Sequence, residues 1–358
     1  MKKIISVILV IIMLLPGSLF HSAVIALVLV LMWRGRLKEY LRPIWRYAYR
    51  MLVGVLAVLT LMLMPRPFAL PTDRVRTVYL DENYNRISPP FHHWLVNILL
   101  PEETLCAMGL MVPLSPWRNM LQIKEGLLKN YDVELKNLQL HKLVTIYHSL
   151  AMRLESPLSG AYAQSSNVVG ETPTRTAYII KPKHYDADKS YPVVFFAHGF
   201  LGNFRMYPAM LDGIDDKIVV VFGTKDRSGF YNRSDINALF THYIPMLEAD
   251  GYKIDSDELS LLGLSNGGSA VDVAYAGYGN RFKNLVYIST GVNNFHRIKA
   301  KVMVIGGGHD TCAASMKSGI RRLKANGQKS SHLFLDDATH LMSAIENDKM
   351  IEFLQAEL

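Results

Sequence analysis

Cysteine is scarce in this chain: Cys106 and Cys312 are the only two among 358 residues. One pair, widely separated, cannot form a disulfide framework, and such cysteines are more often free than bridged. The sequence also lacks Cys or His pairs at zinc spacing, a phosphate-binding loop and a dinucleotide fingerprint. His92-His93 are adjacent, so their side chains point in different directions and make a poor metal pair. No metal and no cofactor are therefore predicted.

Acidic residues are almost absent from the first 70 positions, where Glu39 is the only one. Three apolar runs without any Asp or Glu occupy this region, and at about 1.5 Å per residue the first two together are long enough for one tilted span or a short hairpin. A soluble core helix explains any one run alone, and Lys2-Lys3 before the first run also resembles a secretory signal. Three runs within 65 residues favour an uncleaved membrane anchor with two or three spans. The runs are Ile4–Leu15, Leu19–Trp33 and Met51–Met64.

The positive charge of the chain is concentrated in the same region. Residues 1–70 hold nine Lys and Arg, so 30 of the 39 basic and 30 of the 31 acidic side chains remain for the other 288 residues. Because basic loops stay cytoplasmic, the basic segment 34–50 predicts a multi-pass membrane protein whose later residues lie on the outer, extracytoplasmic side. The alkaline pI then reports attraction to a lipid bilayer and does not support nucleic-acid binding.

The most informative motif is Gly263-Leu264-Ser265-Asn266-Gly267. It follows the strand-like run Leu259–Leu262 and precedes a small-residue segment, Ser269–Ala276, that is typical of a helix. A serine on a sharp strand-to-helix turn exposes its hydroxyl, and flanking glycines avoid collisions with neighbouring backbone. An ordinary tight turn could carry the same letters, so the motif needs support from elsewhere in the chain.

Two later features supply that support. The run Lys301–Ile305 ends in three glycines and then His309-Asp310, which places a carboxylate just past a strand. A second strand-like run, Ser331–Leu335, leads to His340. Serine, acid and histidine in this order along the chain are typical of the α/β-hydrolase triad and differ from the orders of the other serine-hydrolase architectures.

The chemistry assigns a role to each side chain. Ser265 is the predicted nucleophile, His340 the general base and then acid, and Asp310 the carboxylate that orients the imidazole. Asp336 and Asp337 are rivals for the third role, but their closeness to His340 in the sequence suits a loop-shaping function better. His309 could be mistaken for the base, yet it adjoins the acid and would leave the residue 340 loop unexplained.

An oxyanion hole is expected after an earlier buried strand, Tyr191–Ala197, which ends in His198-Gly199-Phe200-Leu201. The backbone N–H groups of Phe200 and Asn266 are the predicted donors, with Leu201 as the alternative to Phe200. His198 is predicted to brace this loop and not to act in catalysis.

Residues from about 174 to 358 resemble the α/β-hydrolase superfamily, and Leu261–Gly268 is similar to the elbow of polyhydroxybutyrate-depolymerase-like and feruloyl-type esterases. The resemblance implies an α/β fold with a doubly wound, mostly parallel sheet, preceded here by N-terminal transmembrane helices. Further expected strands and helices fit this layout. The strands are 174–181, 217–223 and 284–290, and the helices are 235–249, 312–325 and 341–358. Only ten residues separate Thr290 from Lys301, so the site is expected to be open, without a cap there, unless the region before residue 174 covers it.

Three parts are thus predicted: a membrane anchor (1–70), a helical stalk or lid plus linker (71–173) and the catalytic domain (174–358). The leading hypothesis is a membrane-anchored serine hydrolase that cleaves small-molecule or lipid carboxylic esters through an acyl-serine. A thioesterase or acyltransferase would use the same triad. A noncatalytic binding protein on a hydrolase scaffold is the alternative from another class. The sequence does not fix an oligomeric state.

Overall fold

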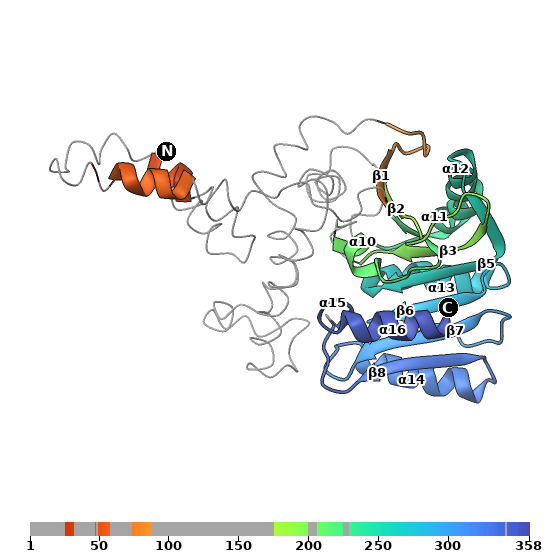
Figure 1. Cartoon of the computed structure of the whole chain (residues 1–358). Coiled ribbons are helices and arrows are strands. Elements are labelled where there is room, and N and C mark those ends of the chain that lie inside the picture. The colour runs from red at the N-terminus through yellow and green to blue at the C-terminus, as the bar shows by residue number, and fades with distance from the viewer. Residues whose placement is uncertain are drawn as a thin grey trace.

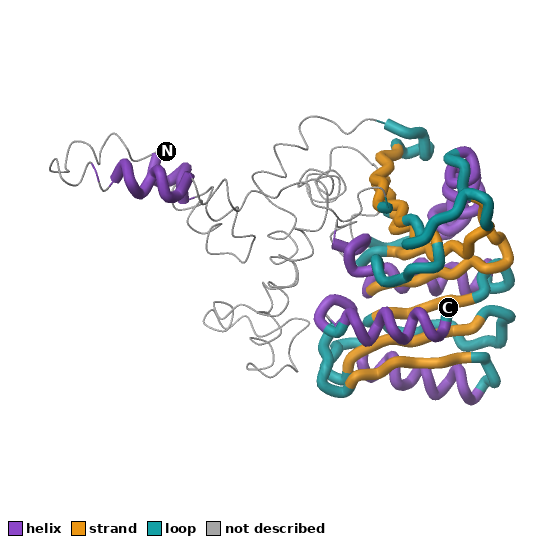
Figure 2. The backbone as a smooth tube through the Cα atoms, in the orientation of Figure 1, coloured by secondary structure: helices purple, strands orange, loops and turns teal. Residues whose placement is uncertain are grey.

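The computed structural model describes residues 26–31, 47, 49–57, 74–87, 175–199, 206–224, 229–340 and 342–358. Within this part of the chain one eight-stranded sheet organises the fold, in the order β1-β2-β4-β3-β5-β6-β7-β8 (Figures 1 and 2). The strands are β1 (Val75–Leu80), β2 (Arg175–Ile180), β3 (Ser190–Ala197), β4 (Ile218–Phe222), β5 (Lys253–Leu264), β6 (Asn284–Ile288), β7 (Lys301–Gly307) and β8 (Ser330–Leu335). The neighbouring strands β4, β3, β5, β6, β7 and β8 are parallel, whereas β2 runs antiparallel to both of its neighbours, β1 and β4. The predicted doubly wound, mostly parallel sheet is confirmed.

Both faces of the sheet are covered, and the inner part of β3, Val193–Ala197, is apolar and buried at nearly every position. In β3, Val193 and Phe195 contact one core cluster, while Val194 and Phe196 contact the other. The first cluster lies under the helices α11 (Arg233–Ala238), η1 (Leu239–Tyr243), α12 (Ile244–Ala249), α13 (Gly268–Tyr278) and α14 (Ala313–Ala325). The second lies under α10 (Met206–Leu211), α15 (Met342–Ile345) and α16 (Asn347–Glu357). This two-sided burial explains the continuous apolar runs of the parallel strands.

Two expected helices are interrupted. The predicted helix 235–249 begins at Arg233 and passes through a π-helical segment, η1, directly before Pro245 enters α12. Proline lacks an N–H and crowds the preceding turn, which a locally widened helix relieves. The predicted helix 341–358 is divided at Glu346 into α15 and α16.

Strand β1 was not predicted from the sequence. It lies within segment 71–173 and pairs antiparallel with β2, from Val75 opposite Ile180 to Leu80 opposite Arg175. Arg76 and Arg86 both contact the carboxylate of Asp250, which ties this part of the chain to the end of α12. The sheet therefore includes residues ahead of position 174. The rest of segment 71–173, predicted as a helical stalk or lid plus linker and containing Cys106 and His92-His93, lies outside the described residues.

In the N-terminal region, residues 26–31 and 49–57 are helical, and the Tyr49 hydroxyl donates to the backbone oxygen of Val30 at 3.3 Å. The remainder of the three apolar runs lies outside the described residues. No helix in the described ranges has the length and apolar character that crossing a bilayer requires.

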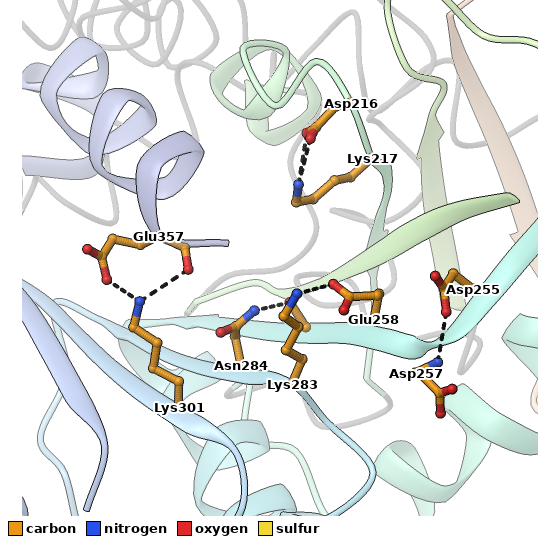
Figure 3. A network of polar contacts seen from close by, with 10 residues as sticks. Asp216, Lys217, Asp255, Asp257, Glu258, Lys283, Asn284, Lys301 and Glu357 are labelled. Atoms are coloured by element: carbon orange, nitrogen blue, oxygen red, sulfur yellow. Dashed lines mark hydrogen bonds and ion pairs between the residues drawn. The ribbon is translucent and has the colours of Figure 1, made fainter. Parts of the chain in front are cut away.

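Charged pairs occupy the edge of the sheet where the parallel strands begin (Figure 3). The amine of Lys301, at the start of β7, contacts the side-chain carboxylate of Glu357 and its backbone oxygen, the latter at 3.2 Å. The Ser331 hydroxyl donates to the same carboxylate at 2.5 Å. The C-terminal helix α16 is thereby joined to two strands.

These contacts predict a pH-dependent contribution to stability. The hydrogen bond from Lys301, followed by that from Ser331, lowers the pKa of Glu357, so the stabilisation is present above the unfolded-state pKa and is lost as pH falls through the folded-state pKa. We expect Glu357→Gln to lower the free energy of unfolding by about 1 kcal/mol near pH 7, with the deficit shrinking below about pH 4. Denaturant unfolding at both pH values measures this. Glu352→Gln, an exposed position on the same helix, is the control; an equal loss in both variants would contradict the prediction.

Candidate active site

Ser265 lies at the turn between β5 and the helix α13, where it is the first residue of the short 3-10 segment η2 (Ser265–Gly267). Its φ is +53°, a left-handed conformation that a non-glycine residue seldom adopts. A Cβ at Gly263 would lie 2.3 Å from the backbone oxygen of Gly267, and one at Gly267 would lie 2.2 Å from that of Ala197. Only glycine at both positions lets β5, the turn and β3 approach this closely, so the motif forms a strained elbow.

The loops after β7 and β8 are held against each other by backbone contacts. The N–H of Gly308 donates to the oxygen of Leu335 at 2.8 Å, and that of His309 donates to the oxygen of Ala338 at 2.9 Å. A Cβ at Gly307 or Gly308 would lie 2.2 Å from a backbone oxygen of the facing loop. The glycines that follow the predicted strand are therefore required for the two loops to meet.

The three predicted side chains meet at this edge of the sheet. His340 Nε2 lies 2.9 Å from Ser265 Oγ, and His340 Nδ1 lies 3.1 Å from each carboxylate oxygen of Asp310. The Asp310 side chain is completely buried, whereas the His340 side chain keeps 28% of its exposure. In this arrangement the hydroxyl can pass its proton to the imidazole, while the buried carboxylate orients the imidazole.

The structure combines a strand-to-helix elbow, a mostly parallel sheet and a triad in the chain order serine, aspartate, histidine. The described residues have an α/β-hydrolase fold. The resemblance found in the sequence is thus confirmed for the fold and for the arrangement of its strands and elbow.

No protein-family model and no curated protein sequence matches the chain. Among solved structures, similar ones include a ferulic acid esterase (14% identity, 52% of this chain and 92% of the other, TM-score 0.44). A hyperthermophilic esterase from the archaeon Pyrobaculum calidifontis has 13% identity over 51% of this chain and 80% of its own, with a TM-score of 0.42. A ferulic acid esterase from the anaerobic fungus Anaeromyces mucronatus has 19% identity over 52% and 85%, with a TM-score of 0.40.

The other acids and the other histidine of this edge take no part in the contacts of Ser265. Asp336 is exposed and its carboxylate lies 3.9 Å from the amine of Lys317, while Asp337 is also exposed. His309 is exposed and joins the neighbouring loop through its backbone N–H. Only Asp310, among the described acids, contacts the imidazole of His340.

Of the predicted oxyanion donors, Asn266 lies in η2 directly after Ser265, whereas Phe200 and Leu201 lie outside the described residues. Gly199, the residue before Phe200, is next to the nucleophile: a Cβ there would lie 3.2 Å from the Ser265 Cβ. The loop after β3 therefore begins beside the serine, which is the position that an oxyanion-hole loop requires.

His198 braces the start of this loop. It is buried, its Nδ1–H donates to the oxygen of Gly199 at 2.8 Å, and its backbone N–H donates to the Tyr231 hydroxyl at 3.0 Å. Burial lowers the pKa of His198 to about 4, against which the Gly199 contact acts only in part. The side chain is consequently a neutral histidine in the folded protein near neutral pH.

This burial predicts acid sensitivity. Because the unfolded chain binds a proton at residue 198 between about pH 6.5 and 4 and the folded chain does not, stability falls as the pH is lowered through this window. His198→Asn keeps a donor for Gly199 but cannot titrate. We expect wild type to lose about 2–3 kcal/mol more than this variant between about pH 7.5 and 4.5, measured by denaturant unfolding. Parallel losses in the two proteins would contradict the assignment.

Sequence reasoning missed two residues that support the elbow. The backbone N–H of Tyr231 donates to Ser269 Oγ at 2.8 Å, and this hydroxyl donates to the oxygen of Asn266 at 2.7 Å. The Tyr231 hydroxyl in turn donates to the oxygen of Phe222 at 2.8 Å and accepts from His198. One tyrosine thus links the segment after β4 to both sides of the nucleophile. No local motif marks Tyr231, because its partners come from three separate segments.

Proposed function

We propose that this protein is a serine hydrolase that cleaves carboxylic esters through an acyl-serine intermediate, without a cofactor. The observation that carries the proposal is the continuous contact chain from Ser265 Oγ through the His340 imidazole to the buried Asp310 carboxylate. The positive φ of Ser265 also supports the proposal, because strained backbone conformations of non-glycine residues cluster at functional sites.

The geometry gives each group a step. His340 Nε2 takes the proton of Ser265 as Oγ bonds to the ester carbonyl carbon, and the carbonyl oxygen becomes an oxyanion that the backbone N–H of Asn266 and a donor from the residue 200 loop stabilise. The protonated imidazole then donates to the leaving alcohol, and the acyl-serine remains. Asp310 accepts from Nδ1–H throughout, which holds the imidazole in the required tautomer. Water enters, loses a proton to Nε2 and releases the acid, so Ser265 regains its proton.

Hydrolysis of p-nitrophenyl esters of increasing acyl length tests this proposal. The purified protein is expected to release an initial burst of p-nitrophenol close to one equivalent per Ser265, followed by slower turnover, where deacylation limits the rate. A bias towards short acyl groups would identify a small-ester esterase, and a bias towards long groups a lipase. Absence of turnover with every ester from folded protein would refute the ester-hydrolase assignment.

We further propose that the N-terminal region anchors the protein in a lipid bilayer and holds the catalytic domain on the outer side. Besides the apolar runs and the basic segment 34–50, large apolar side chains of helix 49–57 are exposed: Met51 at 70%, Leu52 at 48% and Val55 at 51%. Lipid acyl chains would shield these exposed apolar side chains from water.

Protease digestion of sealed membrane vesicles tests this topology. With the outer face exposed, an epitope tag after Leu358 should be removed by protease, and in inverted vesicles it should be protected. Extraction of the intact chain by alkaline carbonate without detergent would contradict integral anchoring, and protection in the first orientation would contradict the proposed side.

A further inference from the structure

Ser289, the first residue after β6, combines two unfavourable features. Its φ is +51°, one of three positive values at non-glycine residues in the described chain; another belongs to Ser265. Its side chain is fully buried, and within the described residues its Oγ has no hydrogen-bond partner. An unpaired buried hydroxyl costs about 1–3 kcal/mol, and the backbone conformation adds strain. Stability alone would favour glycine or alanine here.

The position of Ser289 relates it to the active site. β6 lies between β5 and β7, with Ile288 opposite Leu264 on one side and Ile305 on the other. Ser289 is therefore level with the nucleophile, and its N–H donates to the oxygen of Ile305 at 2.8 Å. Two residues later, the backbone of Gly291 hydrogen-bonds the thiol of Cys312, which follows Asp310 by two residues. The Ser289 loop is thus packed against the loop that carries the triad carboxylate.

One oxygen of the Asp310 carboxylate has room for another hydrogen-bond donor, and the Ser289 hydroxyl could provide it. Oδ1 accepts from the backbone N–H of Cys312 at 2.8 Å and from the Thr311 hydroxyl at 3.4 Å. Oδ2 contacts only His340 among the described residues. A buried carboxylate is stabilised by two or three donors, so the second oxygen has room for one more. An oxygen short of a donor and a hydroxyl short of an acceptor therefore lie on adjoining loops.

We propose that the Ser289 hydroxyl is a positioning group of the triad that donates towards Oδ2 of Asp310, either after rotation about χ1 or through one bridging water. This inference rests on the proposed function. The donated hydrogen bond stabilises the carboxylate anion and moderates its attraction for the proton on His340. The ionisable groups around the contact are Asp310, His340 and Cys312, and burial followed by the charge of Asp310 raises the pKa of the thiol, which keeps it neutral.

Two variants test the proposal, Ser289→Ala and Ser289→Gly. Both remove the hydroxyl, but only glycine also relieves the positive φ. We expect kcat for a p-nitrophenyl ester to fall about 3- to 10-fold in both. The acidic limb of the kcat/KM profile should move to higher pH in both, because a carboxylate that has lost a donor holds the imidazolium proton more strongly. Thermal stability should be equal to wild type or higher.

A purely structural role predicts unchanged catalysis. Removal of an unpaired buried hydroxyl would then stabilise the protein while kcat and the acidic limb stayed at wild-type values, which would overturn this inference. A shift in the glycine variant alone would assign the effect to backbone strain and would also overturn it. If wild type hydrolyses esters and Ser289→Ala is unchanged, only this inference fails. If folded wild type shows no turnover, the proposed function fails and the inference fails with it.

Discussion

Replacement of Ser265 with alanine is expected to lower kcat for ester hydrolysis by a factor of about 10⁴ or more while the fold is retained. Without Oγ no acyl-enzyme can form, and the imidazole 2.9 Å away has no proton to accept. His340→Ala should cause a loss of similar size, because the serine hydroxyl is then a weak nucleophile without a base. Initial rates with a p-nitrophenyl ester measure both effects.

The losses of activity caused by these two replacements are expected not to multiply. The double variant Ser265→Ala, His340→Ala should be no worse than either single variant, because the two side chains act as one unit. Asp310→Asn should also lose most activity, since an amide cannot accept a hydrogen bond in the same way from the Nδ1–H of the charged imidazole. Asp336→Asn is the matched control and should stay within about twofold of wild type. A large loss in Asp336→Asn, or independent losses that multiply, would contradict the assigned triad.

Replacement of Gly267 with alanine should lower the free energy of unfolding by about 4 kcal/mol or more, or prevent folding. The reason is steric and not conformational, because the φ of Gly267 is −61°, which any residue adopts. The added Cβ would lie 2.2 Å from the oxygen of Ala197 and 2.7 Å from that of His198. Both contacts are with backbone, so relief requires the elbow to move away from β3.

Gly277 provides the control within the same helix. It lies on α13, and a Cβ at this position would meet nothing within 4 Å. Gly277→Ala should therefore be neutral or stabilise the protein by up to about 1 kcal/mol, through the higher helix propensity of alanine. Urea unfolding of the two variants separates the outcomes. A Gly267→Ala protein as stable as wild type would show that the elbow is not packed against β3 as described.

The strands of the sheet could be predicted because the information is local. The run Lys301–Ile305, for example, is apolar at every position after Lys301 and ends in glycines that leave room for a turn. The candidate triad could be proposed for the same reason: a glycine-flanked serine, a carboxylate and a histidine each follow a strand, and the carboxyl ends of parallel strands share one edge. Asp310 was favoured over Asp336 because Asp336 lies too close to His340 in the sequence, and among the described acids only Asp310 contacts the imidazole.

The remainder depends on contacts that no window of sequence contains. β1 pairs with a strand about a hundred positions later, so nothing in Val75–Leu80 identifies its partner. Tyr231 joins three separate segments through its backbone N–H and its hydroxyl. The unpaired hydroxyl of Ser289 becomes visible only when the burial and the neighbours of β6 are known.

Labelling with a fluorophosphonate probe tests the central claim most directly. The probe reacts with a serine only where a base removes its proton and nearby donors stabilise the developing charge. Peptide mapping of the labelled protein by mass spectrometry should find one adduct, on Ser265, and none in the Ser265→Ala or His340→Ala variants. Folded wild-type protein that remains unmodified at Ser265, or that reacts equally after His340 is replaced, would contradict the account.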